Sequence, residues 1–377
     1  MKRTSVLLAL WFGVLGPGFL VSAEKGKFEK FTIKKVDAKC EVQLPESGEW
    51  KEVKKDEQHQ AGVMGRTGAS GQMKVEFDKK NSFILMPNST VKISAETRSA
   101  SFQKVLCIAK VEKGAVKVDL EEVKEGDKVG IQTPTAVCGA VGTKFVVAVG
   151  EDTGDPRKGT FACSQGEVQV APTNYENERY DAFVANVGPG STLIASVSPG
   201  QDNAHTKLET SGEAVAMDFG KGKEDPQFSV SKGSVIELAQ PQEENTGTVA
   251  LRVREGKLTA KEGDEAKPHT SGRYLYDGGE VLDVAKSDKP DETREAFDDY
   301  LRLAQVEGDR RADVARKPGD AAAADALNKA AEKATEARNK LFGYRDVIRK
   351  TIRAGQNIGR NLPTRVGGGG SSGSPSR

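Results

Sequence analysis

The chain has 377 residues, a formal net charge of +1, 41 glycines and only 6% aromatic residues. A balanced charge excludes a general nucleic-acid binder, which needs a basic surplus on at least one face. A mean hydropathy of −0.53 excludes a protein with several membrane spans. Abundant glycine favours many turns between short strands, and the length predicts two or three domains.

The first 23 residues have the three parts of a secretory signal peptide. Lys2 and Arg3 are the positive start, Val6 to Leu15 is the apolar run, and Val21-Ser22-Ala23 is the cleavage site. A membrane span needs about 20 apolar residues, so we expect cleavage rather than retention as an anchor. These features predict an exported protein without a membrane span after cleavage.

Export would place the four cysteines of the chain in an oxidising compartment. Their sequence positions are Cys40, Cys107, Cys138 and Cys163. An even number in an oxidising compartment predicts a disulfide, with three connectivities open. The alternative is that they are small buried residues in strands. The spacing of these cysteines in the sequence does not fit a zinc site, because no CxxC pair and no neighbouring histidine is present.

Residues 24–290 show the alternation of apolar and polar residues that is typical of β-strands. Val116, Val118 and Leu120 alternate with charged residues, and Phe145 to Val149 predicts a fully buried strand. A glycine followed by an alternating strand recurs at several places, which are Gly114–Val118, Gly166–Val170, Gly256–Ala260, the similar Gly233–Glu237 and a degenerate copy at Ala38–Val42. This region therefore predicts a β-sandwich or a short β-helix-like stack of strands.

The pattern changes near residue 290. Phe297, Tyr300, Leu301 and Ala304 recur at helical spacing and predict a helix over 292–307. A charged loop over 308–319 and a long helix over 320–354 follow. We expect a helical hairpin over 291–358 that packs on itself or on the β region, with a coiled-coil partner face as the alternative. Residues 359–377 are rich in glycine and serine and predict a disordered tail.

Several motifs in residues 33–172 occur in an order that resembles the FecR-type domain. The most telling are Thr133-Pro134, then Gly142-Thr143 with Phe145, and then Gly166 before an alternating strand. The resemblance implies an all-β domain over 24–172 with a structural role for these residues and no catalytic ones. The β region over 173–290 then predicts a second, degraded copy.

The sensors of that family combine a cytoplasmic anti-sigma segment, one membrane span and a FecR domain. Only a few residues precede the apolar run here, so we expect no anti-sigma segment. The resemblance therefore implies an envelope module of the bacterial periplasm or cell surface that makes protein contacts, in sensing or scaffolding.

The sequence contains no recognisable pattern of catalytic or metal-binding residues. His59, His205 and His269 are far apart and have no second ligand at metal-binding spacing, so we expect no catalytic, metal or cofactor site. The first hypothesis is a non-enzymatic envelope or cell-surface interaction module. The alternative is a protein that binds envelope or extracellular polysaccharide through aromatic side chains, for which the candidates are Tyr175, Tyr180, Tyr274 and Tyr276. A secreted hydrolase is the third hypothesis.

Overall fold

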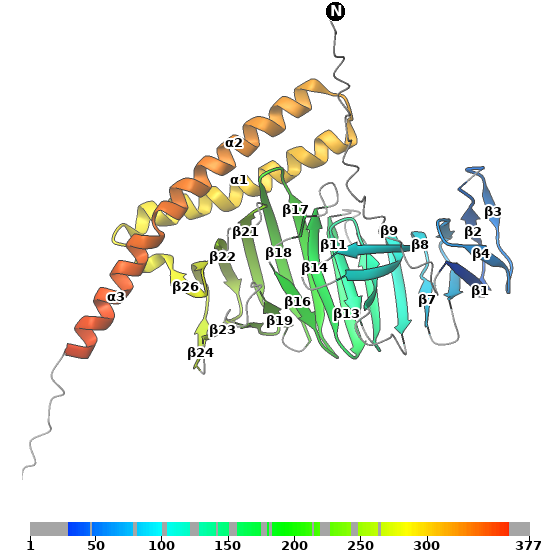
Figure 1. Cartoon of the computed structure of the whole chain (residues 1–377), viewed down its shortest axis with the longest axis horizontal. Coiled ribbons are helices and arrows are strands. Elements are labelled where there is room, and N and C mark those ends of the chain that lie inside the picture. Colours follow the sequence, from blue (N-terminus) through cyan, green and yellow to red (C-terminus); the bar gives the residue numbers. More distant parts are fainter. Residues whose placement is uncertain are drawn as a thin grey trace, which may run out of the picture.

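The computed structural model has a long stack of β-strands with a pair of helices along one side (Figure 1). It describes residues 29–45, 47–77, 81–99, 104–120, 128–140, 142–150, 157–174, 179–180, 183–212, 215–218, 227–242, 248–262 and 265–361. The signal peptide predicted at 1–23 lies outside these residues.

The strands form two layers, which we call sheet A and sheet B. Sheet A has the spatial order β4 (Gln58–Gln60), β1 (Lys30–Asp37), β6 (Gln72–Glu76), β7 (Asn81–Leu85), β9 (Lys104–Leu120), β12 (Lys144–Val149), β13 (Lys158–Gln165), β17 (Thr192–Pro199), β18 (Asn203–Ser211), β21 (Val235–Pro241), β22 (Thr248–Glu255), β25 (Gly272–Asp277) and β26 (Glu280–Asp283). All of these neighbours are antiparallel.

Sheet B has the order β3 (Trp50–Glu52), β2 (Cys40–Gln43), β5 (Met64–Thr67), β8 (Thr90–Ser99), β9, β10 (Lys128–Gln132), β11 (Ala136–Ala140), β14 (Val168–Asn174), β16 (Val184–Val187), β19 (Val215–Asp218), β20 (Gln227–Val230), β23 (Leu258–Glu262) and β24 (Glu265–His269). Its pairs are antiparallel except for β9 with β10. The short β15 (Arg179–Tyr180) pairs with the end of β14. The first half of β9 pairs in sheet B and its second half in sheet A, so this strand joins the layers.

One apolar core fills the space between the sheets. It runs from Phe31 in β1 to Tyr276 in β25 without interruption. The predicted strand Val116, Val118 and Leu120 faces this core, as its alternation indicated. The mainly β fold with a C-terminal helical hairpin is therefore confirmed. The predicted boundary at 172/173 falls inside β14, and the two predicted β regions share both sheets and this core.

The chain crosses between the sheets at corners where one residue has a positive φ. Gly114, Gly166 and Gly256, which begin three of the recurring sequence units, have φ angles of 79°, 78° and 75°. Gly212 adds a fourth such corner with a φ of 82°. A backbone in this region favours glycine because it has no Cβ. The recurring glycines of the sequence thus mark corners at which the chain passes from one sheet to the other.

Each of the three recurring corners packs against a neighbouring corner that carries a buried hydroxyl group. Ser89 accepts a hydrogen bond from Ala115 N and donates one to Ala115 O, both at 2.9 Å. Ser234 makes the same pair of bonds with Lys257, at 3.1 and 3.3 Å. Thr143 donates to Glu167 O at 3.3 Å. These hydroxyls satisfy backbone groups at positions where the strand ladders are interrupted.

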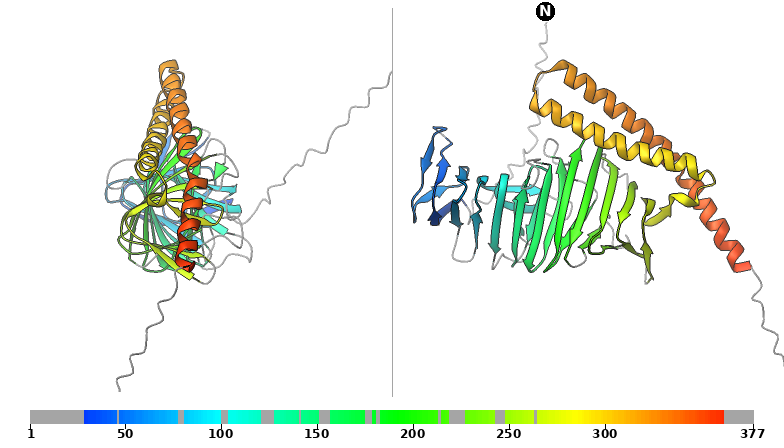
Figure 2. Two further views of the ribbon diagram at one scale, coloured as in Figure 1. Left: turned by 90° about the vertical axis from the view of Figure 1, so that its left-hand side faces the viewer. Right: turned by 180° about the vertical axis from the view of Figure 1, so that it is seen from behind.

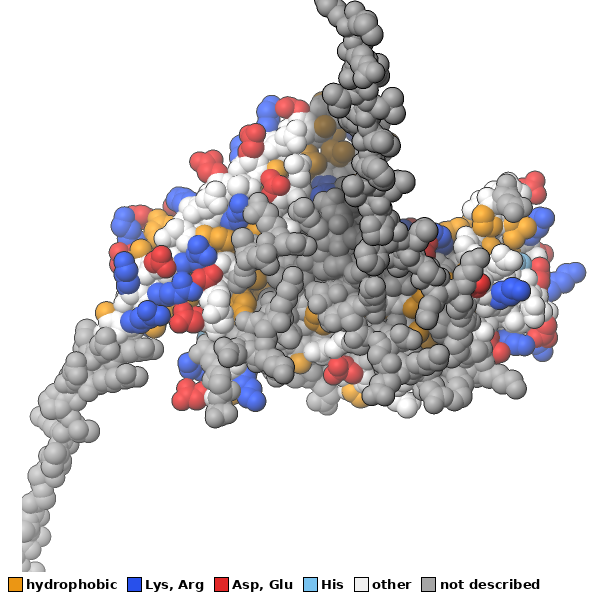
Figure 3. Space-filling model, viewed as in Figure 1, with side chains coloured by type: hydrophobic (Ala, Val, Ile, Leu, Met, Phe, Trp, Pro, Cys, Tyr) orange, Lys and Arg blue, Asp and Glu red, His pale blue; other side chains and the backbone are white. Residues whose placement is uncertain are grey.

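Three helices follow the strands. A short 3-10 turn, Val284–Lys286, leads into α1 (Pro290–Arg316), which packs against α2 (Ala321–Gly343), and α3 (Arg345–Asn361) continues beyond it. Asp320 caps α2 by accepting hydrogen bonds from Ala322 N and Ala323 N. Figure 3 shows basic and acidic side chains interspersed over the solvent side of these helices.

The predicted loop over 308–319 is wrong, because α1 continues to Arg316. Gly308, where the predicted loop began, lies inside α1 against the end of β17, beside the turn to β18, where an added Cβ would lie 2.5 Å from Ser198 O. The predicted long helix is also interrupted, at Tyr344 between α2 and α3. The predicted tail begins within α3, and residues from 362 onward lie outside the described part of the chain.

The first helix packs on the outer face of sheet A and forms a second core. Phe297, Tyr300 and Ala304 lie in one cluster with Ala239 of β21 and Ala250 of β22. Small residues on the strands let the helix come close to the sheet. Figure 2 shows the hairpin on one side of the stack in two further views.

A buried polar group fixes the middle of α1. The carboxylate of Glu307, fully buried, accepts hydrogen bonds from Asp202 N at 2.6 Å and from Asn203 N and Nδ2 at 3.2 and 2.9 Å. Tyr300 donates to Asn203 Oδ1 at 3.1 Å. Burial raises the pKa of Glu307. The turn between β17 and β18 is thereby held to the helix.

The four cysteines are buried free thiols. Cys107 and Cys138 flank β10 on either side, so two strand spacings, about 10 Å, separate them. A disulfide requires Cα atoms within about 7 Å. Their side chains also belong to different clusters. The structure thus has the alternative arrangement, small buried residues in strands, in place of the predicted disulfide. Burial raises the pKa of Cys138 to about 12.

The corner geometry makes a prediction about two glycines. We expect Gly166→Ala to destabilise the protein by about 2–4 kcal/mol, because the new Cβ is strained at positive φ and would lie 2.8 Å from Thr143 Oγ1. Gly233→Ala, at a φ of 71° with nothing within 4 Å, should cost only about 1 kcal/mol. Urea unfolding measures both. Equal losses for the two variants would contradict the packing of neighbouring corners.

Candidate functional site

The residues singled out by the sequence motifs lie at turns and corners. Thr133 is fully buried, and its hydroxyl accepts a hydrogen bond from Ala136 N at 2.9 Å. This bond closes the turn between β10 and β11, in which Pro134 follows Thr133. The Thr-Pro motif therefore shapes a turn.

Gly142, Thr143, Phe145 and Gly166 come together at one corner. Gly142 has a φ of 58°, and Thr143 beside it is fully buried. Gly166 lies so close that a Cβ on it would be 2.9 Å from Gly142 O. Phe145 points into the core with 1% exposure. The spacing of these motifs reflects two strands meeting at a corner.

The histidines stay apart, and each has a packing role. The ring of His59 stacks on Phe31 at 5.6 Å, and that of His269 meets the Tyr274 ring edge-on at 4.8 Å. Burial lowers the pKa of His205 to about 4, so it is neutral at neutral pH. No group of three side chains suited to a metal occurs in the described part of the chain.

Two of the four tyrosines proposed for stacking on sugars, Tyr274 and Tyr276, do not have exposed rings. Tyr274 and Tyr276 share one face of β25, and this face points into the core, so they are 8% and 3% exposed. Tyr274 donates to Thr270 O at 3.0 Å, and Tyr276 meets Phe228 edge-on. Tyr175 lies outside the described residues, and only the backbone of Tyr180 is described.

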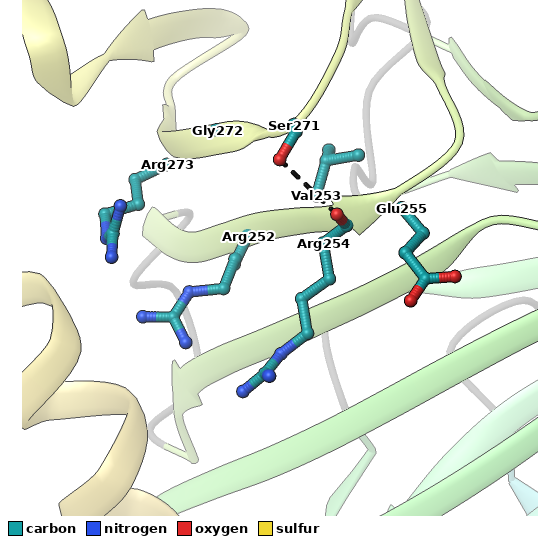
Figure 4. A pocket seen from close by; sticks show the side chains of 7 residues that line it. All are labelled: Arg252, Val253, Arg254, Glu255, Ser271, Gly272 and Arg273. Atoms are coloured by element: carbon teal, nitrogen blue, oxygen red, sulfur yellow. Dashed lines mark hydrogen bonds between the residues drawn. The ribbon is translucent and has the colours of Figure 1, made fainter.

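The structure instead brings three arginines together on the outer face of sheet A, beside α1. They line a hollow of about 430 Å³ that we call the arginine hollow (Figure 4). Its lining residues are Arg252, Val253, Arg254, Glu255, Ser271, Gly272 and Arg273. Figure 4 shows the three arginine side chains fanning out side by side, with Glu255 at the end away from Arg273.

Strand register explains why the arginines converge. Arg252 and Arg254 are two residues apart on β22 and share its outer face. Arg273 of β25 is the register partner of Arg252. Like charges directly opposite each other are destabilising, so neighbouring carboxylates are needed.

Two carboxylates supply this compensation. Glu237, the register partner of Arg252 on β21, accepts from Arg254 Nε at 2.7 Å and from Arg252 Nη1 at 3.3 Å. Asp298 of α1 accepts from Arg273 through two bonds of 2.7 Å and also pairs with Arg252. Burial would raise the pKa of Asp298, but the bonds and charges of Arg273 and Arg252 lower it below its usual value. The arrangement ties α1 to the sheet and is suited to binding an anion.

Sequence reasoning missed this site. The Arg-Val-Arg run at 252–254 indicated two arginines on one strand face. Nothing in the sequence showed that residue 273 is the partner of residue 252, because register is set by the fold as a whole.

Comparison with known proteins places a known family in the first half of the stack. Residues 65–169 match the family model described as FecR protein, so the chain contains a FecR domain, as its motifs indicated. No curated protein matches the chain. The match runs from β5 to the first two residues of β14 and includes the Gly142–Gly166 corner.

A crystal structure from Parabacteroides distasonis ATCC 8503, named "putative anti-sigma factor", is 14% identical with a TM-score of 0.29. The alignment covers 40% of this chain and 59% of that one. No helix in the described part of the chain is both long and apolar enough to span a membrane.

The ion pairs of Asp298 make a prediction about pH. We expect Asp298→Asn to lower the free energy of unfolding by about 1 kcal/mol at pH 7. Because the folded pKa of Asp298 is below the unfolded value of about 3.9, this contribution is present above that value. It should be lost as the pH falls through the folded pKa.

Urea unfolding of the wild type and the variant at neutral pH and near about pH 3 measures the effect. Asp291→Asn is the matched control, because Asp291 is 87% exposed and pairs only along α1 with Arg294. An equal loss at both pH values, or a loss no larger than that of the control, would contradict the role assigned to Asp298.

Proposed function

We propose that this protein is an exported, non-enzymatic FecR-domain module that acts in envelope signalling or scaffolding by contacting another protein. The observation that carries the proposal is the use of the FecR motif residues. Thr133, Thr143 and Gly166 all serve turns and corners, and none presents a reactive group to solvent. The FecR domain itself suggests a signalling-related role.

The end of the stack where sheet B begins supports a role in protein contact. β3 is the outermost strand of sheet B among those described, and its Trp50 is partly exposed. The Arg66 guanidinium lies 4.0 Å from the Trp50 ring centroid and is held by Glu41 at 2.7 Å. Tryptophan and arginine are the side chains most often found at the energetic centre of protein interfaces.

The opposite end of sheet B is less suited to strand addition. β24 carries Pro268 and the charged residues Glu265 and Lys267, and nearly all of it is exposed. Charged side chains and proline on an edge strand discourage pairing with another chain. We therefore assign the contact to the end that carries Trp50.

The polysaccharide hypothesis has less support, because Tyr274 and Tyr276 face the core and cannot stack on a sugar. Removal of the helices is not a useful test of the first hypothesis. A chain ending at residue 290 would expose Ala239 and Ala250, which α1 covers. Point variants of the complete mature chain are the better baits.

The test is affinity capture of proteins from a detergent extract of the cell envelope, with mature wild type, Trp50→Ala and Trp50→Phe as baits. We expect one specific protein partner for the wild type, at least fivefold less of it for Trp50→Ala, and near wild-type recovery for Trp50→Phe, which keeps an aromatic ring. Bait that sediments with cell-wall polysaccharide and captures no protein would favour the alternative. Turnover of polysaccharide or ester substrates would overturn the non-enzymatic assignment.

A further inference from the structure

We propose that the arginine hollow binds carboxylate groups presented by an acidic segment of a partner protein. The proposal rests on the function proposed above and names the chemistry of the partner. The hollow lies outside the residues that match the FecR family, so it would give this chain a contact of its own.

The arginines of the hollow have hydrogen-bond donors that their own carboxylate partners do not use. Three guanidinium groups share two carboxylates, those of Glu237 and Asp298. In the described part of the chain, the single carboxylate partner of Arg254 is Glu237, which binds its Nε atom and also forms an ion pair with Arg252. Arg252 Nε is buried and has no hydrogen-bond partner among the described residues. Glu255 also lines the hollow and balances the third charge, so the cluster offers an incoming group guanidinium donors that Glu237 and Asp298 do not use.

The arginines of the hollow differ in how accessible their side chains are to solvent. The Arg254 side chain is 51% exposed, whereas that of Arg252 is 17% exposed. Arg254 is thus the arginine that an incoming group meets first. An arginine fork binds a carboxylate through two parallel hydrogen bonds, and Arg273 already binds Asp298 in this way.

The residues that line the hollow indicate which class of ligand it can bind. A site for a small metabolite is usually enclosed by apolar side chains, and Val253 is the single apolar residue that lines this hollow. A sugar site would offer an aromatic ring, and none lines the hollow, because the neighbouring Tyr274 faces the core. An acidic side chain on an extended or looped segment can reach the exposed Arg254 without being enclosed.

The experiment measures binding of a fluorescently labelled hexaglutamate peptide to the mature protein by anisotropy at low ionic strength. We expect binding that Arg254→Ala weakens about tenfold, and a hexaglutamine peptide that does not bind. Arg302→Ala is the matched control, because Arg302 is 62% exposed and pairs only along α1 with Asp299. It removes the same charge outside the hollow and should leave the affinity unchanged. Arg254→Lys keeps the charge without the fork and should bind with intermediate affinity.

Equal weakening by Arg254→Ala and Arg302→Ala, or no binding of hexaglutamate at all, would overturn the proposal. Tighter binding of an oligogalacturonate than of hexaglutamate, with the same dependence on Arg254, would assign the hollow to an acidic glycan instead. Removal of Arg254 leaves Glu237 paired with Arg252, and far-ultraviolet circular dichroism verifies that each variant is folded.

The two proposals fail separately. A specific protein captured from the envelope by a chain that does not bind hexaglutamate would remove only the assignment of the hollow. Hexaglutamate binding that depends on Arg254, in a chain that captures no protein, would remove the proposed function and leave the chemistry of the hollow in place.

Discussion

The structure depends on one local constraint, which is how the chain turns from one sheet to the other. At each recurring corner a residue with positive φ reverses the backbone next to a buried serine or threonine of the neighbouring corner. The hydroxyl of that serine or threonine bonds to backbone groups that no strand can reach, as Ser89 does with Ala115 and Ser234 with Lys257. Because successive corners pack on one another, each new pair of strands is added in register, and one core continues from the first strand of sheet A almost to the last.

The same register determines what the outer surface offers. Since side chains alternate along a strand, a core on the inner face leaves every second residue of sheet A on the outside. Near the end of the stack these outer residues are small where α1 docks and charged beside it, as Ala250 and Arg252 on β22 show. Asp298 joins the two zones, because it belongs to α1 and binds arginines of two strands. The ion pairs that hold α1 to sheet A are therefore formed by the same arginines that line the hollow.

Local patterns in the sequence were enough to predict the strands, the family and the helical hairpin. Val116 and Val118 alternate with charged neighbours, and the glycines at 114, 166 and 256 marked corners, because a positive φ favours glycine. Properties that depend on distant partners could not be predicted in this way. Asn88 makes a corner without glycine, and Gly308 lies inside a helix because it packs against a turn far away in the sequence. The convergence of Arg252 and Arg273 and the orientation of Tyr274 toward the core depend on register, which no local pattern contains.

The FecR region and the strands after it form one stack, and the unfolding of residues 24–377 tests this continuity most directly. Trp50 is the single tryptophan after the predicted signal peptide and reports on the first end of the stack through its fluorescence. Circular dichroism at the helical minimum reports on α1 and α2, which pack on the other end. The account predicts coincident transitions in urea for the two probes, because the sheets and the core are continuous. Two separate transitions, with the FecR region and the later strands unfolding independently, would contradict it.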